Sequence, residues 1–264
     1  MAITIAILSQ KGGTGKTTLT RSLADGLSRA GLDTLAIDSD PQGNLSEYFG
    51  VPADAFPTLG EVLAGQHKAV DAIHDGVIPA NLGLAEAELM LAGKIGRELT
   101  LRSALREPKR QYEVILIDCP PTLGLLTVNA LVAADRAILS TEAEHFSEQG
   151  AEQAMQVINL AKENLNPDLE LLGIMLNIAD MRTRHARRTL ELLREEFGDL
   201  VFDTVIRRSI VYPESARAGQ PIYEFNRRKA VDYARLTVEV LERLDLSDPL
   251  EKAKKTLRDL EPKT

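Results

Sequence analysis

The sequence contains 264 residues, of which 44% are hydrophobic and 27% charged, as in ordinary soluble globular proteins. This length suits one large domain with an ample core and excludes two domains of comparable size. A net charge of −8 argues against a wholly basic nucleic-acid-binding protein, although it is compatible with a local basic face. Cys119 is the single cysteine, which excludes an internal disulfide framework, and the four scattered histidines lack the spacing of zinc ligands.

The apolar segments of the sequence are short. Residues 3–8 are too few for a signal peptide, and the longest apolar run, residues 123–134, is too short to span a bilayer. We therefore expect a cytoplasmic protein.

A strand, a glycine-rich turn and a helix follow one another at the start of the chain. Residues 3–8 are apolar, residues 11–18 read KGGTGKTT, and leucines with helical spacing follow. This order is typical of a phosphate-binding loop, in which backbone N–H groups and a helix N-terminus enclose an anion. Lys16 would contact the β- and γ-phosphates of ATP, and the Thr17 hydroxyl would coordinate Mg²⁺. The predicted nucleotide-binding residues of the loop are Gly12, Gly13, Thr14, Gly15, Lys16, Thr17 and Thr18.

The loop contains a second lysine, Lys11, five residues before Lys16, and Gln10 occupies the place of the first glycine in the general pattern. A lysine that cannot fold back onto its own phosphates can reach those held by a facing subunit; the alternative is a lysine that lies in solvent. With this spacing, the loop resembles that of the deviant Walker-A ATPases, the ParA/MinD family. The resemblance implies that Lys11 crosses a nucleotide-sandwich homodimer and acts with Lys16 in catalysis.

Residues 34–37 predict a buried strand, and two aspartates follow it. A strand's carboxyl end beside the phosphate loop is where α/β sheets bind ligands, although Asp38, Asp40 and the run PQGN at 41–44 also suit a turn. Both interpretations can hold together. By resemblance this segment is switch I, closer to ParA than to MinD, in which Asp40 orients the attacking water and Asp38 lies in the outer shell of the metal.

The aliphatic run at residues 112–118 predicts a strand buried on both faces that ends in Asp118. Asp118 is the Walker-B candidate that holds Mg²⁺ through water; a helix cap is the alternative. Residues 120–124 would form switch II. The runs at 119–121 and 129–131 also resemble the family.

The remaining segments alternate between strand and helix patterns. A short strand is expected at 81–84, further strands at 137–140, 169–176 and 200–206, and helices at 150–165 and 186–197. The alternation predicts an α/β fold, a doubly wound and mostly parallel sheet flanked by helices on both faces. We expect a single P-loop NTPase domain over residues 1–264, without an N-terminal helix-turn-helix domain and with a loosely packed helix at 248–264.

Positive charge gathers between residues 177 and 229, where eleven Lys/Arg oppose eight Asp/Glu. Non-specific DNA binding requires such a local excess, and solvated helix faces with Arg–Glu pairs are the alternative. The run at 208–222 resembles the ParA stretch that contributes to the adenine pocket and the DNA surface, which assigns Arg208 to the nucleotide. Asn177 ends a strand and suits either an adenine contact or a turn. The DNA-binding candidates are Arg187, Arg207, Arg217, Arg227 and Arg228.

Only Arg228 matches a family position that contacts DNA. Val211 replaces a second such arginine, and Arg207 replaces a common proline, so Arg207, Arg217 or Arg227 would supply the missing charge. The resemblance covers nearly the whole chain and implies a ParA-like ATPase that pairs on ATP, binds the nucleoid and is stimulated by a ParB-like or other cargo adaptor. The alternative is a MinD-like switch that positions cargo at a membrane, for which the stripe of leucines at 250–260 is thin. We expect no membrane binding.

Overall fold

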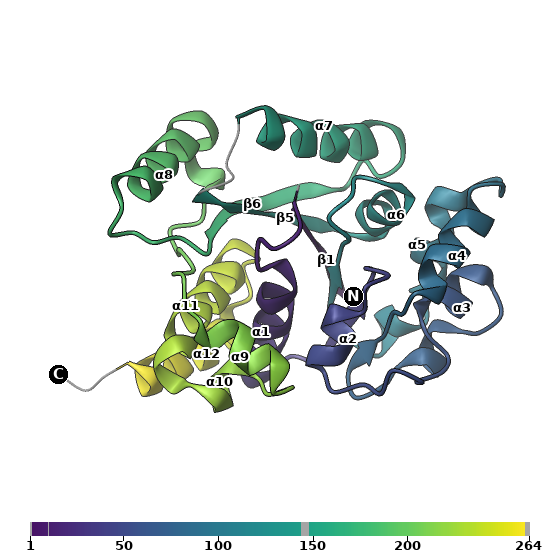
Figure 1. Ribbon diagram of the computed structural model, residues 1–264, viewed down its shortest axis with the longest axis horizontal. Coiled ribbons are helices and arrows are strands. Elements are labelled where there is room, and N and C mark those ends of the chain that lie inside the picture. Colours follow the sequence, from purple (N-terminus) through teal and green to yellow (C-terminus); the bar gives the residue numbers. More distant parts are fainter. Residues whose placement is uncertain (1, 10, 144–147, 262–264) are drawn as a thin grey trace.

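A parallel β-sheet lies between two layers of helices in the computed structural model, which describes residues 2–9, 11–143 and 148–261 (Figure 1). In this part of the chain the sheet has six strands in the order β3-β2-β4-β1-β5-β6, all paired in parallel. The α/β fold with a doubly wound sheet is confirmed. The strands are β1 (Ile3–Leu8), β2 (Thr34–Asp38), β3 (Val77–Ile78), β4 (Val114–Asp118), β5 (Arg136–Glu142) and β6 (Glu170–Asn177).

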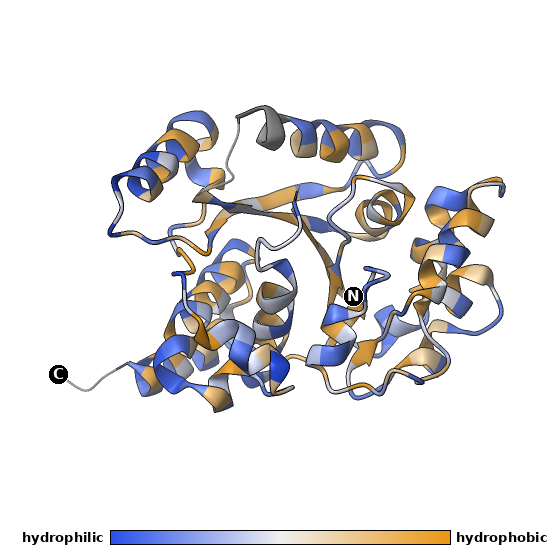
Figure 2. Ribbon diagram, viewed as in Figure 1, coloured by the Kyte–Doolittle hydropathy of each residue, from blue (hydrophilic) through white to orange (hydrophobic). Residues whose placement is uncertain are grey.

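Both faces of the sheet are buried, which explains the near-continuous apolar strands. Along β1, Ile5 and Ile7 belong to one hydrophobic cluster, whereas Ala6 and Leu8 belong to the other. One face is covered by α1 (Lys16–Arg29), α9 (Val211–Arg217), α10 (Ile222–Phe225), α11 (Arg227–Arg243) and α12 (Ser247–Leu260). The other is covered by α3 (Leu59–Ala64), α4 (Gly83–Leu91), α5 (Thr100–Ala104), α6 (Leu125–Ala133), α7 (Glu148–Asn164) and α8 (Arg184–Phe197), as Figures 1 and 2 show.

Short helices complete the connections between these elements. Helix α2 (Asn44–Tyr48) follows β2, and Leu45 packs on Ala36 and Val77. The described 3₁₀ helices are η1 (Ala69–Ala72), η2 (Arg97–Leu99), η3 (Pro108–Arg110) and η5 (Gly198–Leu200).

Helix α1 packs unusually closely against the C-terminal layer at Gly26. A Cβ atom at this position would lie 2.2 Å from Thr237 Oγ1 and 2.7 Å from the Tyr223 hydroxyl. Glycine is therefore required where α1 meets α10 and α11. The close contact fixes the helix that begins directly after the glycine-rich loop.

Two predicted strands are wrong. Residues 81–84 begin α4 instead, because the Asn81 carboxamide oxygen accepts a hydrogen bond from the Gly83 amide at 2.9 Å and starts the helix. Residues 200–206 run beside β6 with a bridge between Ile174 and Val201, but they form no strand in the structure. The amides of Asp203 and Thr204 donate instead to the Glu239 carboxylate of α11.

The C-terminal helix also differs from expectation. In place of a loosely held segment, α12 packs against α11 and α1, with Ala253 buried and Leu250, Leu257 and Leu260 on the hydrophobic cluster of that layer. Its apolar stripe is therefore used inside the molecule. Among the described residues, no helix combines the length and apolar character needed to cross a membrane.

Candidate nucleotide-binding site

The carboxyl ends of three neighbouring strands bring the predicted acidic residues to the glycine-rich loop. Asp118 at the end of β4 is in register with Ile7 of β1 on one side and with Asp38 of β2 on the other. The loop leaves β1 next to them. Ligands of doubly wound sheets bind at this edge, where the strand order changes direction.

The loop backbone is shaped for an anion. Gly13 and Gly15 have φ angles of +82° and +73°, which other residues rarely adopt. A Cβ atom at Gly15 would also lie 3.0 Å from the Asn177 amide nitrogen. Helix α1 begins at Lys16 with neither a side-chain cap nor an acidic residue in its first turn. Its first backbone N–H groups and the positive end of its dipole are therefore directed at a ligand.

Lys16 and Asp118 form a buried ion pair at the floor of the site, with Nζ and Oδ1 separated by 3.0 Å. Burial alone would lower the pKa of Lys16, but the charge of Asp118 and its hydrogen bond raise the pKa above the ordinary value. The Thr17 and Thr20 hydroxyls also donate to the Asp118 carboxylate, at 2.8 and 3.2 Å. Lys16 is thus charged and ready to exchange this carboxylate for phosphate oxygens.

Asp38 lies behind this pair and is fully buried. Its carboxylate accepts hydrogen bonds from the Asp40 amide at 3.1 Å and from both the amide and the hydroxyl of Ser46 at 2.8 Å. Burial, with the nearby charge of Asp118, nevertheless raises the pKa of Asp38 to about 7. Cys119, next to Asp118, is also buried, and burial raises the pKa of its thiol to about 12, so it is no reactive thiolate.

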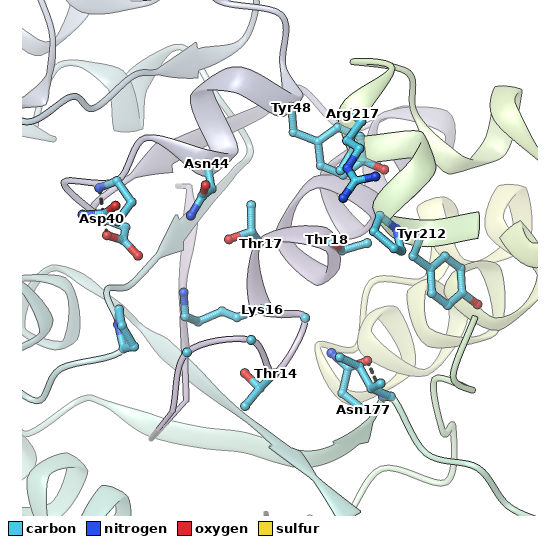
Figure 3. A pocket seen from close by; sticks show the side chains of 18 of the residues that line it. Thr14, Lys16, Thr17, Thr18, Asp40, Asn44, Tyr48, Asn177, Tyr212 and Arg217 are labelled. Carbon is cyan, nitrogen blue, oxygen red and sulfur yellow. Dashed lines mark hydrogen bonds between the residues drawn. The ribbon is translucent and has the colours of Figure 1, made fainter. Parts of the chain in front are cut away.

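A cavity of about 870 Å³ opens above the loop. Figure 3 shows Lys16 and Thr17 on one side of it, Asp40 and Asn44 on another, and Asn177 and Tyr212 at the far end. All of the predicted nucleotide-binding residues thus line one cavity, whereas Asp38 and Asp118 are not among its lining residues. Its lining includes residues 11–18, Asp40, Gln42, Asn44, Glu47, Tyr48, Pro121, Asn177, Ile178, Arg208, Ser209, Ile210, Tyr212, Pro213, Ala216, Arg217 and Tyr233.

Asp40 and Asn177 are held by local hydrogen bonds. Asp40 Oδ1 accepts from the Gln42 amide at 3.0 Å, which fixes the carboxylate at the cavity wall. Asn177 Oδ1 accepts from the Ile178 amide at 2.9 Å, while its Nδ2 donates to Ser140 Oγ at 3.3 Å. Asn177 is therefore held by local hydrogen bonds at the end of β6 and lines the cavity.

Lys11 lies at the rim of this cavity. Its backbone oxygen accepts from Ser9 Oγ at 3.0 Å and from Thr14 Oγ1 at 3.5 Å, whereas the residue is exposed. The backbone is fixed, and the side chain is on the solvent side. Gln10 lies outside the described residues.

The DNA-binding candidates are all exposed, but only Arg217 lines the cavity. Arg187 is on α8, and its Nη1 donates to the Met181 oxygen at 3.4 Å. Arg207 donates through Nε and Nη2 to the buried Asp232 carboxylate, and these hydrogen bonds raise the pKa of Arg207. Arg227 and Arg228 begin α11, where Arg227 Nη2 donates to the Asp259 oxygen at 3.0 Å.

Several residues of the site were not predicted from the sequence, among them Thr20, Glu47 and Tyr48. Glu47 and Tyr48 line the cavity from α2, and Thr20 donates to Asp118. Thr20 lies one helical turn after Lys16, so helical spacing would have placed its hydroxyl beside the phosphate lysine. Tyr48 carried no comparable signal, because α2 is a five-residue helix.

The donor set fits a magnesium nucleotide. Mg²⁺ prefers oxygen ligands and keeps waters and phosphate oxygens in its shell. The Thr17 hydroxyl and the Asp118 carboxylate lie 2.8 Å apart beside the phosphate loop and supply such oxygens. Within the described residues, no group of three or more His, Cys, Asp or Glu side chains could hold a metal ion by itself.

These features define a phosphate-binding-loop nucleotide-binding protein of the doubly wound α/β class. The family model of the AAA domain AAA_31 matches residues 2–171. Sporulation initiation inhibitor protein Soj of Bacillus subtilis is 38% identical over 89% of this chain and 97% of its own length. The chromosome-partitioning ATPase Soj of Treponema pallidum is 35% identical over 92% of this chain and 98% of its own. The chain belongs to the ParA/Soj family of chromosome partitioning ATPases.

A solved structure shows the same fold with ligands. Cobyrinic acid a,c-diamide synthase from Mycobacterium smegmatis with a bound ATP analog and magnesium has a TM-score of 0.81 and 32% identity. The match covers 93% of this chain and 97% of that one. The comparison confirms the fold and the kind of ligand that it accommodates.

Proposed function

We propose that the chain is a partitioning ATPase that pairs around two ATP molecules, binds DNA without sequence specificity as a pair, and separates after hydrolysis. ATP and Mg²⁺ are its cofactors. A ParB-like or other cargo adaptor stimulates hydrolysis, and the pair acts on the nucleoid in the cytoplasm. The observation that carries this proposal is the placement of Lys11, exposed at the rim of the nucleotide cavity on a fixed backbone.

Lys11 and Lys16 are placed for different tasks. Lys16 is buried at the cavity floor against Asp118, where it serves the nucleotide of its own subunit. Lys11 is exposed and lines the cavity, which supports a role in which its ammonium binds the phosphates of a second subunit that closes over the cavity. Such a contact adds a cation to the transition state, where charge spreads over the phosphate oxygens.

The test is the ATP-dependent size of the Lys11→Ala variant, measured by light scattering after gel filtration with a non-hydrolysable ATP analogue. Lys162→Ala removes an exposed lysine on α7 and is the matched control. The parent and the control should become dimers, whereas Lys11→Ala should remain a monomer that still binds a fluorescent ATP analogue. If Lys11→Ala dimerises at the same concentration of the ATP analogue that makes the parent dimerise, the proposal is refuted.

Within each subunit, the residues divide the work of hydrolysis. The α1 N-terminus and Lys16 bind phosphates, while Thr17 and Asp118 hold the metal, which neutralises charge on the phosphates when bound. Asp40 orients the attacking water, and Asn177 and Arg208 contact the adenine end. Without a partner, turnover should be slow, on the order of 10⁻⁴ to 10⁻² per second, as for unassisted P-loop switches. Asp40→Ala should bind ATP and pair but release no phosphate.

We assign DNA binding to the exposed arginines between residues 187 and 228. Arg228 stands in the first turn of α11, where helix N–H groups add to its attraction for a DNA phosphate. The surface also includes the exposed Arg187, Arg217 and Arg227. Arg207 would first have to break its hydrogen bonds to Asp232. Pairing doubles the number of arginines, which makes binding depend on ATP.

The test is a salt titration of DNA binding by Arg228→Glu, with Arg102→Glu, an exposed arginine on α5, as the control. Each lost phosphate contact should reduce the slope of log K against log salt by roughly 0.9. Arg228→Glu should lose DNA binding while its ATP affinity is kept. Unchanged binding at low salt would exclude this surface.

A MinD-like membrane switch is less well supported. It needs an apolar helix face that can enter a bilayer, and the leucines of α12 are packed on the core instead. Sedimentation with anionic vesicles in the presence of ATP separates the two functions. The proposed one predicts that the protein stays in the supernatant.

A further inference from the structure

A patch of exposed apolar side chains covers the outer side of α4 and the segment after it. Leu82, Leu89 and Met90 are 71%, 78% and 63% exposed, Ile95 is fully exposed, and Leu99 is 41% exposed. These are five of the ten large apolar side chains that are exposed among the described residues. Figure 1 places α4 at one end of the molecule, beside α3 and α5.

Helix α4 carries large apolar residues on its outer side as well as on its inner side, and Glu86 is also exposed there. Its inner side, with Leu84, Ala87 and Leu91, is buried in the core, so the outer leucines do not hold the helix in place. A surface helix normally carries polar residues on its outer face. Large apolar patches on soluble proteins mark contact sites for other molecules.

A basic cavity adjoins this patch. It measures about 480 Å³, and its lining includes Lys68, Lys94 and Arg106 against one acid, Glu107. The cavity and the patch are neighbours along the chain, because Lys94 directly precedes the exposed Ile95 and the cavity-lining Thr100 directly follows Leu99. Net positive charge is unusual here, since the whole chain carries −8. The charge complement of the cavity is a carboxylate.

Hydrogen bonds connect this corner to α6. Asn129 of α6 accepts from the Leu101 amide at 3.1 Å and donates to the Arg97 oxygen at 2.9 Å. Glu88 of α4 accepts from the Leu126 amide in the first turn of α6 at 3.4 Å. Helix α6 directly follows residues 120–124, the predicted switch II behind Asp118. A partner bound to this corner would therefore contact elements that position switch II.

We propose that the outer face of α4 and the adjoining basic cavity form a docking surface for a protein partner. Its binding segment is an amphipathic helix with bulky apolar residues along one face and Asp or Glu at its border. The apolar residues cover Leu89, Met90 and Ile95, and a carboxylate enters the cavity to meet Lys94 and Lys68. The concave shape favours a protein segment over a bilayer, because a carboxylate side chain can enter the cavity and a flat lipid surface cannot.

The experiment is photo-crosslinking in cells that naturally make the protein, with p-benzoyl-phenylalanine in place of Leu89 or Ile95 in the full chain. The same group in place of Leu160, which is 58% exposed on α7, is the control. We expect a protein adduct from the first two positions only, and mass spectrometry should find the crosslink in an acidic amphipathic segment. An adduct with lipid or with a second copy of this chain, a segment of other chemistry, or no adduct would overturn the proposal.

Charge reversal provides the second measurement. Lys68→Glu together with Lys94→Glu should reduce the adduct at Leu89 at least tenfold, whereas Lys162→Glu should leave it unchanged. Equal yields from both variants would refute the role of the cavity. ATP-dependent pairing, measured on the same preparations, should be normal in every variant. Loss of the crosslink with normal pairing would concern the docking surface alone. Loss of pairing with a normal crosslink would count against the proposed function alone.

Discussion

The stability of the nucleotide-free chain should depend on pH through Asp38. Burial raises the pKa of this carboxyl from its ordinary value of 3.8 to about 7. The folded chain therefore keeps a proton that the unfolded chain releases between these values. The stability from this carboxyl is fully present below pH 4 and is lost as the pH rises through 7. The shift of about 3 pKa units corresponds to about 4 kcal/mol in total.

The perturbation is Asp38→Asn, which keeps the size of the side chain and cannot ionise. Its NH₂ group replaces one acceptor oxygen, so one of the hydrogen bonds from Ser46 or the Asp40 amide is lost, at a pH-independent cost of about 1–3 kcal/mol. Part of the Asp38 contribution is already lost at pH 5. Between pH 5 and pH 8 the parent should therefore lose about 2–3 kcal/mol relative to the variant.

The assay is urea denaturation of parent and variant at both pH values, with EDTA and without nucleotide. Other titrating groups are common to the two proteins and cancel in the difference. Parallel pH dependences would show that Asp38 is ionised in the folded chain at pH 5, and the account of its burial would be wrong.

Two further predictions concern the cavity. Gly15→Ala should weaken ATP binding about tenfold, measured by titration of a fluorescent analogue, because alanine is strained at φ +73° and its Cβ would press on Asn177; unchanged affinity would mean that the loop tolerates another backbone shape. Tyr48→Phe should lower the free energy of unfolding by about 1 kcal/mol, measured by denaturation, because it removes the hydrogen bond to Ser215. Ser215 keeps a second partner in the Gln220 oxygen, and a loss above about 3 kcal/mol would contradict this reasoning.

The central part of the fold could be predicted from the sequence because its signals are local. The apolar runs that end in Asp38 and Asp118 predict buried strands. The glycines before Lys16 predict a phosphate loop, and neither prediction depends on the rest of the chain. The register that brings the two aspartates side by side then follows from the parallel sheet.

The errors arose where distant residues decide the structure. Residues 200–206 have a strand-like pattern, but two of their backbone amides donate to the carboxylate of Glu239, which lies on helix α11. The hydrogen bonds of Arg207 likewise depend on Asp232, which lies 25 positions away, and its role in DNA binding stays a prediction. The packing of α12 depends on α1 and α11, and no pattern within residues 248–264 reports those partners. Tertiary contacts of this kind override local preference.

The buried hydrogen bond of 2.6 Å between Tyr48 and Ser215 has a consequence for nucleotide exchange. Tyr48 belongs to the helix after Asp40, and Ser215 to the helix that carries Arg217, so two neighbouring helices of the cavity wall are joined. A movement that separates α2 from α9 would have to break this bond. If ADP release requires such a movement, its rate, rather than the strength of phosphate binding, would set how soon a subunit can bind ATP again.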